Sequence, residues 1–232
     1  MPQGDFEMTG PRRRGLIGDV PAPVVWLAGL LAAIYFAMAL APAALEAALS
    51  ERFGLDPFRM TLGARAPGGW TGAVAPVFTH LLIHASAAHL FFNLLWLVVF
   101  GTPIARRLRS AIRFNLFFLM CAAAGGLFFS LFHLRDATLL VGASGGITGL
   151  LGGLVRFAFH RPYSKRVSAK GVLPLTDRSV LTWSAVVILM NASIAVFGAG
   201  LGAGDANIAW EAHVGGYLFG LILFPLFDPA RR

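Results

Sequence analysis

The 232 residues are 57% hydrophobic and only 13% charged, and a mean hydropathy of +0.72 excludes an ordinary soluble domain. The net charge of +8 does not indicate nucleic-acid binding, because the basic residues lie in short segments between apolar runs, where they set membrane orientation. The single cysteine, Cys121, excludes an intrachain disulfide and a cysteine metal site.

Six apolar runs of roughly 18 residues or more follow one another, the length that crosses a hydrocarbon layer of about 30 Å as a helix. They cover about 22–45, 82–101, 112–134, 144–159, 180–198 and 210–227. The first run is too long for the apolar core of a cleaved signal peptide, and further runs follow it. The sequence therefore predicts an all-α polytopic membrane protein with a short N-terminal segment (1–21), a six-helix domain (22–228) and a short tail (229–232).

The segments between the runs divide the basic residues unevenly. With the N-terminus in the cytoplasm, 15 of the 19 Lys and Arg residues fall on the cytoplasmic side, so both termini are expected there. The first outer loop, about 46–78, carries Trp70 and apolar patches, and we expect it to lie partly in the membrane interface. The last outer loop, "FGAGLGAGDAN" at 197–207, is glycine-rich and is predicted to form a movable cap.

Polar side chains inside three of the runs fall at a similar depth. A helix rises about 1.5 Å per residue, so Ser144, Asn93 and His213 lie about 18, 20 and 22 Å from the first charge on their cytoplasmic side. These charges are Arg156, Arg106 and Asp228. In a core of about 30 Å, all three sit about 8–12 Å below the outer surface. His89 lies four residues before Asn93 and shares its helix face.

The polar residues at this depth can turn a serine hydroxyl into a nucleophile. A serine hydroxyl needs a base within hydrogen-bond reach, and His213 can supply it. No acidic residue lies at this depth, which predicts a Ser-His dyad. Gly142 and Gly145 allow a tight turn that leaves the oxyanion position open. The oxyanion donors are expected to be the backbone N–H of Ser144 and the side chains of His89 and Asn93.

Each of these residues also has a purely structural interpretation. Ser144 could cap a helix whose small residues, Gly145, Gly149 and Gly153, recur every four positions and pack against another helix. His213 could be a hydrogen-bonded histidine between helices, and Asn93 could join two helices through its amide. Two more histidines are expected at the water interface in structural roles: His80 and His84.

Other protease chemistries fit the sequence less well. "GAGD" at 202–205 matches the motif of intramembrane aspartyl proteases, but no predicted span holds an aspartate to face Asp205. "HLLIH" at 80–84 has metalloprotease spacing without the required glutamate. A transporter would carry charges inside the membrane along its pathway, and none is found in the six runs apart from the ends.

At three places the chain resembles the rhomboid family of intramembrane serine proteases: "HASAAHLFFN" at 84–93, "GASG" at 142–145 and "AHVGGYLFG" at 212–220. The resemblance implies a six-helix bundle, Ser144 as nucleophile, His213 as base and acid, and His89 and Asn93 as oxyanion donors. It also implies that Gly216 and Gly220 let the sixth helix pack closely on the fourth. Thr148 stands where the family often has an aromatic residue, and Trp70 is followed by Thr71 instead of arginine.

The expected activity is therefore hydrolysis of peptide bonds in or beside transmembrane helices of membrane-protein substrates, within the lipid bilayer. No metal, nucleotide or other cofactor is required, and no nucleic-acid partner is expected. The alternative is a rhomboid-like pseudoprotease that binds membrane proteins without cutting them. Because the N-terminus carries acidic residues, unlike a transit peptide, a bacterial cytoplasmic membrane is favoured.

Overall fold

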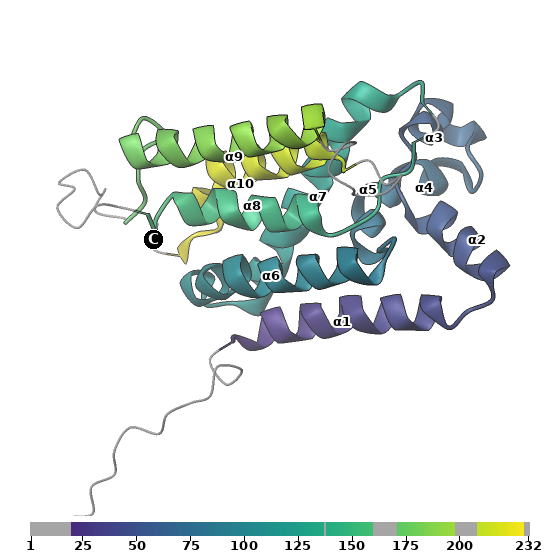
Figure 1. Cartoon of the computed structure of the whole chain (residues 1–232), viewed down its shortest axis with the longest axis horizontal. Helices are drawn as coiled ribbons and strands as arrows, with labels where there is room; N and C mark the ends of the chain where they lie inside the picture. The colour runs from purple at the N-terminus through teal and green to yellow at the C-terminus, as the bar shows by residue number, and fades with distance from the viewer. Residues whose placement is uncertain (1–19, 137, 160–170, 198–207, 230–232) are drawn as a thin grey trace, which may run out of the picture.

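A computed structural model of the chain describes residues 20–136, 138–159, 171–197 and 208–229. The long helices form a bundle in which α7 crosses behind its neighbours at an angle (Figure 1): α1 (Ala22–Ala39), α6 (Ala87–Leu108), α7 (Ala111–His133), α8 (Ser144–Val155), α9 (Arg178–Phe197) and α10 (Trp210–Phe227). Shorter helices gather at one end of this bundle: α2 (Ala43–Phe53), α3 (Pro57–Leu62), η2 (Gly63–Arg65), α4 (Gly69–Val74), α5 (Pro76–Thr79) and η3 (His80–Leu82). The described residues form helices and no strands, as predicted for the all-α class.

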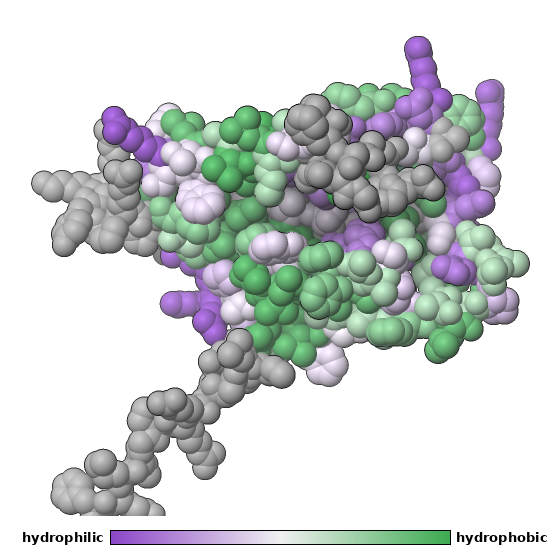
Figure 2. Space-filling view, viewed as in Figure 1, coloured by the Kyte–Doolittle hydropathy of each residue, from purple (hydrophilic) through white to green (hydrophobic). Residues whose placement is uncertain are grey.

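Four helices of the described part are long and apolar enough to cross a membrane: α1, α6, α7 and α10. The count of six membrane spans therefore stays a prediction. Figure 2 shows hydrophobic residues over the middle of the visible face, whereas long hydrophilic side chains extend from its two ends. This distribution is what a lipid-embedded bundle requires, because its outer surface meets hydrocarbon instead of water.

The central helix α8 differs from its neighbours in length and surroundings. It has 12 residues, which corresponds to about 18 Å, well short of a hydrocarbon core of about 30 Å. Every residue of α8 is buried except Ser144 and Thr148. Because its neighbours shield it from lipid, α8 can begin inside the membrane, and its first residue then lies below the ends of the longer helices.

Several helix ends differ from the predicted boundaries for local reasons. The first helix ends at Ala39 instead of about 45, because Pro42 cannot continue it and starts α2. The second begins at Ala87 instead of 82, where the Ser86 hydroxyl accepts a hydrogen bond from the His89 N–H at 3.1 Å. The fourth ends at Val155, where the buried Arg156 side chain donates to backbone carbonyls of two other segments, those of Leu173 and Leu221.

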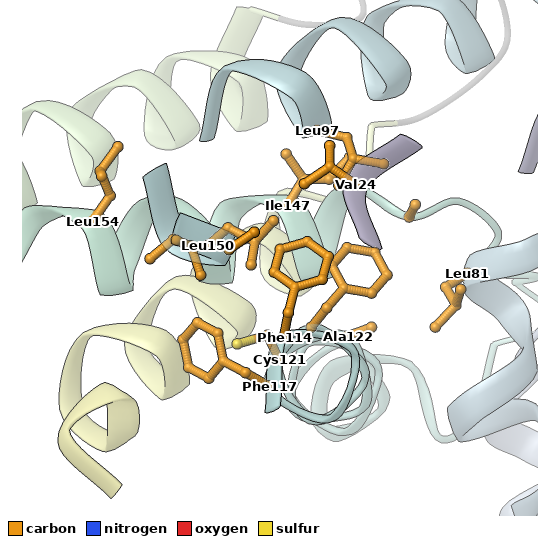
Figure 3. Packing of buried hydrophobic residues seen from close by; sticks show 14 of the residues in the cluster. Val24, Leu81, Leu97, Phe114, Phe117, Cys121, Ala122, Ile147, Leu150 and Leu154 are labelled. Atoms are coloured by element: carbon orange, nitrogen blue, oxygen red, sulfur yellow. The ribbon is translucent and has the colours of Figure 1, made fainter. Parts of the chain in front are cut away.

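Apolar side chains from α1, α6, α7 and α8 meet in the largest buried cluster (Figure 3). Leu97, Phe114, Phe117 and Leu150 are fully buried in it. Gly153 lies near the C-terminal end of α8, and a Cβ added there would come within 3.0 Å of Phe117. In lipid, close contact of this kind holds helices together, because hydrocarbon solvates an exposed leucine as well as a protein core does.

The contact between α8 and α10 is made largely by glycine backbone. A Cβ added at Gly216 would overlap the carbonyl oxygen of Gly145, and one added at Gly220 would overlap that of Gly149. A Cβ at Gly149 would in turn overlap the side chain of Cys121 on α7. The two helix backbones therefore touch directly at Gly145 and Gly149, which is the close approach expected of small residues in membrane helices.

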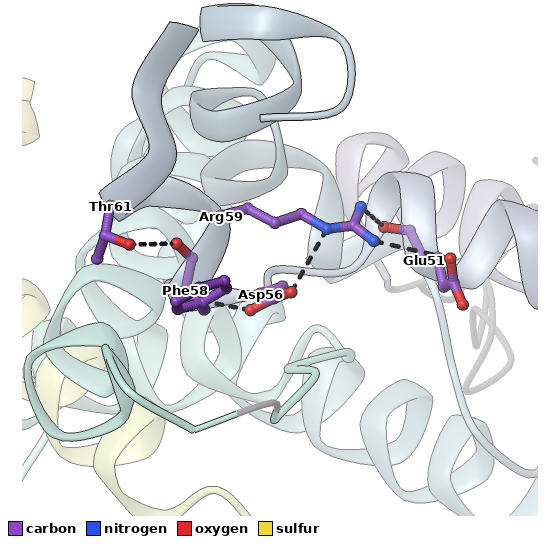
Figure 4. Close-up of polar contacts among 5 residues, drawn as sticks. All are labelled: Glu51, Asp56, Phe58, Arg59 and Thr61. Carbon is purple, nitrogen blue, oxygen red and sulfur yellow. Dashed lines mark hydrogen bonds and ion pairs between the residues drawn. The ribbon is translucent and has the colours of Figure 1, made fainter. Parts of the chain in front are cut away.

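The long first loop is ordered by polar contacts around Arg59 (Figure 4). Asp56 caps α3 by accepting from the Phe58 N–H at 3.0 Å, and it lies 3.4 Å from the Arg59 side chain. Arg59 also donates to the carbonyl oxygen of Glu51 at 2.7 Å, which ties α3 to the end of α2. The Thr61 hydroxyl donates to the Phe58 carbonyl at 2.7 Å. These bonds fold the loop into short helices instead of an extended connection.

The same loop is fastened to the segment that leads into α8. Leu55 and Leu140 exchange two backbone hydrogen bonds of 2.9 and 2.8 Å in an isolated antiparallel bridge. The Thr79 hydroxyl donates to the Phe53 carbonyl at 2.8 Å, which joins α5 to the end of α2. The first loop therefore fixes the backbone just before Ser144.

Candidate active site

Ser144 is the first residue of α8, and the backbone before it makes a turn that only glycine adopts easily. Gly142 has φ +112°, and its N–H donates to the His80 carbonyl at 2.9 Å. A Cβ at Gly142 would come within 2.7 Å of the His89 ring. Ala143 holds the N-cap position, and no side chain caps α8 within the described residues. Ser144 is therefore not the helix N-cap, and that structural interpretation is wrong.

The structure brings Ser144 and His213 together. The Oγ atom of Ser144 lies 2.9 Å from Nε2 of His213, which is on the first turn of α10. Gly145 and Gly216, which follow these two residues on α8 and α10, are in backbone contact, so the short distance is a consequence of the helix packing. The first N–H groups of α8 have no carbonyl partner within the helix, and they point out of the same end that presents the hydroxyl.

The opposite nitrogen of His213 has a partner that the sequence analysis missed. Nδ1 of His213 lies 3.0 Å from Oδ1 of Asn191 on α9, and the Asn191 amide nitrogen donates to the Val187 carbonyl at 2.8 Å. Asn191 is only 1% exposed. A signal was present: Asn191 lies thirteen residues after Arg178, about 20 Å along a helix, which is the same depth as the other polar groups.

His89 and Asn93 lie on α6 beside the turn that precedes Ser144. The His89 ring contacts the position of Gly142, two residues before Ser144, and packs edge-on against His84 with 5.2 Å between ring centroids. The Asn93 amide nitrogen donates to the His89 carbonyl in its own helix at 2.8 Å. In the described part of the chain its Oδ1 atom is buried without a hydrogen-bond partner. The interhelical bond expected of a purely structural asparagine is therefore not seen among these residues.

Thr148 occupies the space between the two helices that carry the pair. Its hydroxyl oxygen lies 2.9 Å from the Ser144 carbonyl, 3.0 Å from that of Gly145 and 3.1 Å from that of His213. One hydroxyl hydrogen is shared among these acceptors, so the bond to His213 links α8 to α10 without an aromatic ring.

The two histidines predicted at the water interface are instead buried, so that prediction is wrong. His80 is 1% and His84 is 6% exposed, because α5 and η3 fold beneath the end of α7. Nδ1 of His80 donates to the Pro76 carbonyl at 2.9 Å. Burial lowers the pKa of His80 from its ordinary value to about 4, so the ring is neutral and serves as a structural support under Gly142.

A second polar contact ties α10 to α7 at the same end of the bundle. Glu211, on the first turn of α10, lies 3.2 Å from Nε2 of His133, and Nδ1 of His133 lies 3.3 Å from Asp136. The His133 ring stacks on Phe129 with 4.2 Å between centroids. This contact restrains the end of α10 two residues before His213.

Some predicted features lie outside the described residues: the N-terminal segment up to residue 19, most of the predicted cap (198–207, with Asp205) and the last residues, 230–232. Within the described ranges, no group of three or more His, Cys, Asp or Glu side chains is arranged to hold a metal ion.

Comparison with known proteins matches most of the chain to one family model. A model described as the rhomboid domain matches residues 71–228, a range that contains Ser144, His213, Asn191 and both oxyanion candidates. The chain is also 28% identical over 158 residues to mouse Rhomboid-related protein 2, a match that covers 65% of this chain and 48% of that protein. The chain therefore spans about half the length of this curated relative.

Proposed function

Because the chain belongs to the rhomboid family, we propose that it is an intramembrane serine endopeptidase that hydrolyses peptide bonds in or beside transmembrane helices. The observation that carries the proposal is the 2.9 Å contact between Ser144 Oγ and His213 Nε2. A pseudoprotease needs neither this contact nor an open helix N-terminus beside it. The integral membrane character follows from the family and from the four apolar helices of the described part.

The first half of the reaction makes an ester with the enzyme. Nε2 of His213 takes the proton of the Ser144 hydroxyl as Oγ attacks the carbonyl carbon of the scissile peptide bond. The negative charge on the carbonyl oxygen is stabilised by the Ser144 backbone N–H at the start of α8 and by His89 and Asn93. The protonated His213 then gives its proton to the leaving nitrogen, the C–N bond breaks, and an acyl ester on Ser144 remains.

The second half removes the acyl group with water. His213 takes a proton from a water molecule that attacks the ester carbonyl, and it returns that proton to Oγ as the C–O bond breaks. The products are a new carboxylic acid, which loses its proton to water, and the free Ser144 hydroxyl. No metal or other cofactor enters either half of the reaction, because His213 moves every proton.

The depth of the site favours substrates whose helices unwind easily. A peptide bond in a helix is shielded by its own backbone hydrogen bonds, so it reaches Ser144 only in a locally extended segment. We therefore propose that the protein prefers membrane proteins with small or helix-breaking residues near the cut.

The proposed location is a bacterial cytoplasmic membrane with both termini in the cytoplasm. The described arginines at the end of α6 and the start of α9 support this orientation, since these helix ends lie at the end of the bundle away from Ser144. Cysteines introduced for Ala111 and Ala64, both exposed, test it beside the buried Cys121. An impermeant thiol reagent should label the Ala64→Cys protein in intact spheroplasts and the Ala111→Cys protein only in inverted vesicles.

The activity is tested with purified full-length protein in liposomes and a fluorescently labelled single-span membrane protein. Cleavage by the wild type and none by the Ser144→Ala variant is the expected result. A wild-type protein that binds such substrates but cuts none of a panel with helix-breaking residues would overturn the proposal in favour of the pseudoprotease.

Covalent labelling gives a second test that needs no substrate. A fluorescent phosphonate should modify Ser144, since His213 makes the hydroxyl nucleophilic. The His213→Ala variant, compared at equal concentration, should react far more slowly. Equal labelling of both proteins would rule out His213 as the base.

A further inference from the structure

We infer that Asn191 is a positioning residue for His213, an inference that rests on the proposed protease activity. Its amide oxygen accepts a hydrogen bond from Nδ1–H of His213 and thereby leaves Nε2 free to take the proton of Ser144. The pair predicted from the sequence then becomes a chain of three side chains from three helices: α9, α10 and α8.

The orientation of the Asn191 amide is fixed by its second contact. The amide nitrogen lies 2.8 Å from the Val187 carbonyl oxygen, one helical turn earlier on α9. If the nitrogen and oxygen of the amide changed places, two acceptor oxygens would face each other in a buried site. The oxygen is therefore the atom that lies 3.0 Å from Nδ1 of His213.

This orientation determines which ring nitrogen of His213 carries the proton. An amide oxygen only accepts hydrogen bonds, so Nδ1 must be the donor. A neutral imidazole has one N–H, and its other nitrogen, Nε2, then has a lone pair directed at Ser144 Oγ, 2.9 Å away. Without Asn191 the neutral ring can also carry its proton on Nε2. In that tautomer Nε2 cannot accept the serine proton.

The surroundings explain why an amide does this work instead of a carboxylate. Asn191 is 1% exposed on a helix of the bundle, where an unpaired ionised carboxylate would be costly. The nearest described carboxylate on α10, Glu211, is held by His133 of α7. On the other side of the site α6 contributes His89, which is not within hydrogen-bond reach of Asn191. A neutral acceptor orients the ring without adding a buried charge.

The chain offers a matched control for a merely structural role. The Ser184 hydroxyl lies 2.8 Å from the Tyr217 hydroxyl, and this contact also joins α9 to α10. It lies about two turns of α9 from Asn191 and involves no residue of the proposed reaction. If Asn191 only holds the two helices together, its loss and the loss of Ser184 should have the same kind of effect.

The kinetic test compares Asn191→Ala, Asn191→Asp and Ser184→Ala in the full-length protein. Asn191→Ala should lower kcat at least tenfold with little change in KM, while its melting temperature stays close to that of Ser184→Ala. Asn191→Asp should recover most of the activity, because a protonated carboxyl donates to the Val187 carbonyl and still accepts from Nδ1–H. Equal kcat values for Asn191→Ala and Ser184→Ala would overturn the inference.

A spectroscopic test does not depend on turnover. In ¹⁵N-histidine NMR spectra of the wild type, the His213 signals, identified by their absence from His213→Ala, should show the proton on Nδ1. A proton on Nε2 would overturn the inference even if the enzyme is active. If the wild type cuts no substrate, the proposed function fails, while the Nδ1 result still decides the role of Asn191.

Discussion

Nε2 of His213 and Oγ of Ser144 lie 2.9 Å apart, although 69 residues separate the two positions along the chain. The contact joins the first turns of two helices whose backbones touch at Gly145 and Gly216. Neither side chain has to extend far, so the geometry depends on the helix packing more than on rotamer choice.

Alanine at either member of this contact should abolish cleavage, and the Ser144→Ala/His213→Ala double variant should be no less active than either single variant. Residues that act as one unit lose their joint contribution when either is removed. Residual rates are measured with the labelled membrane substrate. Ser193→Ala serves as the control, because this exposed hydroxyl bonds only to the Leu189 carbonyl of its own helix. A double variant that cleaves a hundredfold more slowly than either single variant would show that Ser144 and His213 do not act as one unit.

Asn93→Ala should lower kcat by about 10²–10³, which corresponds to about 2.7–4 kcal/mol, if the amide donates to the oxyanion. KM and the melting temperature should change little, because that bond forms in the transition state and the observed ground-state bond lies within α6. The kcat, the KM and the melting temperature are measured on one preparation of the variant. A protein that loses about 0.6 kcal/mol of stability and keeps its full kcat would identify Asn93 as a structural residue.

Gly216→Ala should destabilise the protein by about 1–3 kcal/mol, since the new methyl group overlaps the Gly145 carbonyl and forces α8 from α10. Gly29→Ala on α1 is the matched control, because a Cβ there meets nothing within 4 Å. That change should instead stabilise its helix by about 0.5–1 kcal/mol. The free energy of unfolding of both variants is measured in detergent. Equal effects of the two substitutions would show that the glycine contact is not tight.

The stability of the protein should fall as the pH drops from about 6.5 to 4, in part because of His80. Its folded pKa is lowered to about 4, so over this range the unfolded state binds a proton that the folded state excludes. The full contribution is about 3 kcal/mol. His80→Asn keeps a donor for the Pro76 carbonyl but cannot titrate. The melting temperature of this variant should vary less with pH than that of the wild type. Parallel plots of melting temperature against pH for the two proteins would exclude His80 as a source of the pH dependence.

The helical class and the meeting of Ser144 with His213 are predictable from sequence, because length and polarity inside an apolar run are local properties. Asn191 satisfies the same depth criterion, so its place beside His213 is predictable in the same way. The burial of His80 was not predictable in this way. It arises because Gly126 of α7 leaves room for the ring, with the imidazole 3.1 Å from a Cβ added there. A contact of this kind joins segments far apart in the chain, so no periodicity reports it.

The length of α8 was equally hidden from the sequence. Its apolar run continues past Val155 to residue 159, so composition alone cannot show that the helix ends at Val155. The end depends on Arg156, which reaches two carbonyls from other parts of the fold, those of Leu173 and Leu221. A buried arginine that binds carbonyls and one that marks the membrane surface look the same in a sequence.

The glycine contact between α8 and α10 also determines how the protein responds to its bilayer. Side chains at a helix interface can change rotamer under lateral pressure, but two touching backbones have no such freedom. Lipid acts instead on outward side chains of α10, such as Ile222 and Leu226, which are 50% and 66% exposed. A thicker or thinner membrane is then accommodated by tilting the bundle as a whole. The spacing of Ser144 and His213 is thereby insulated from the composition of the surrounding lipid.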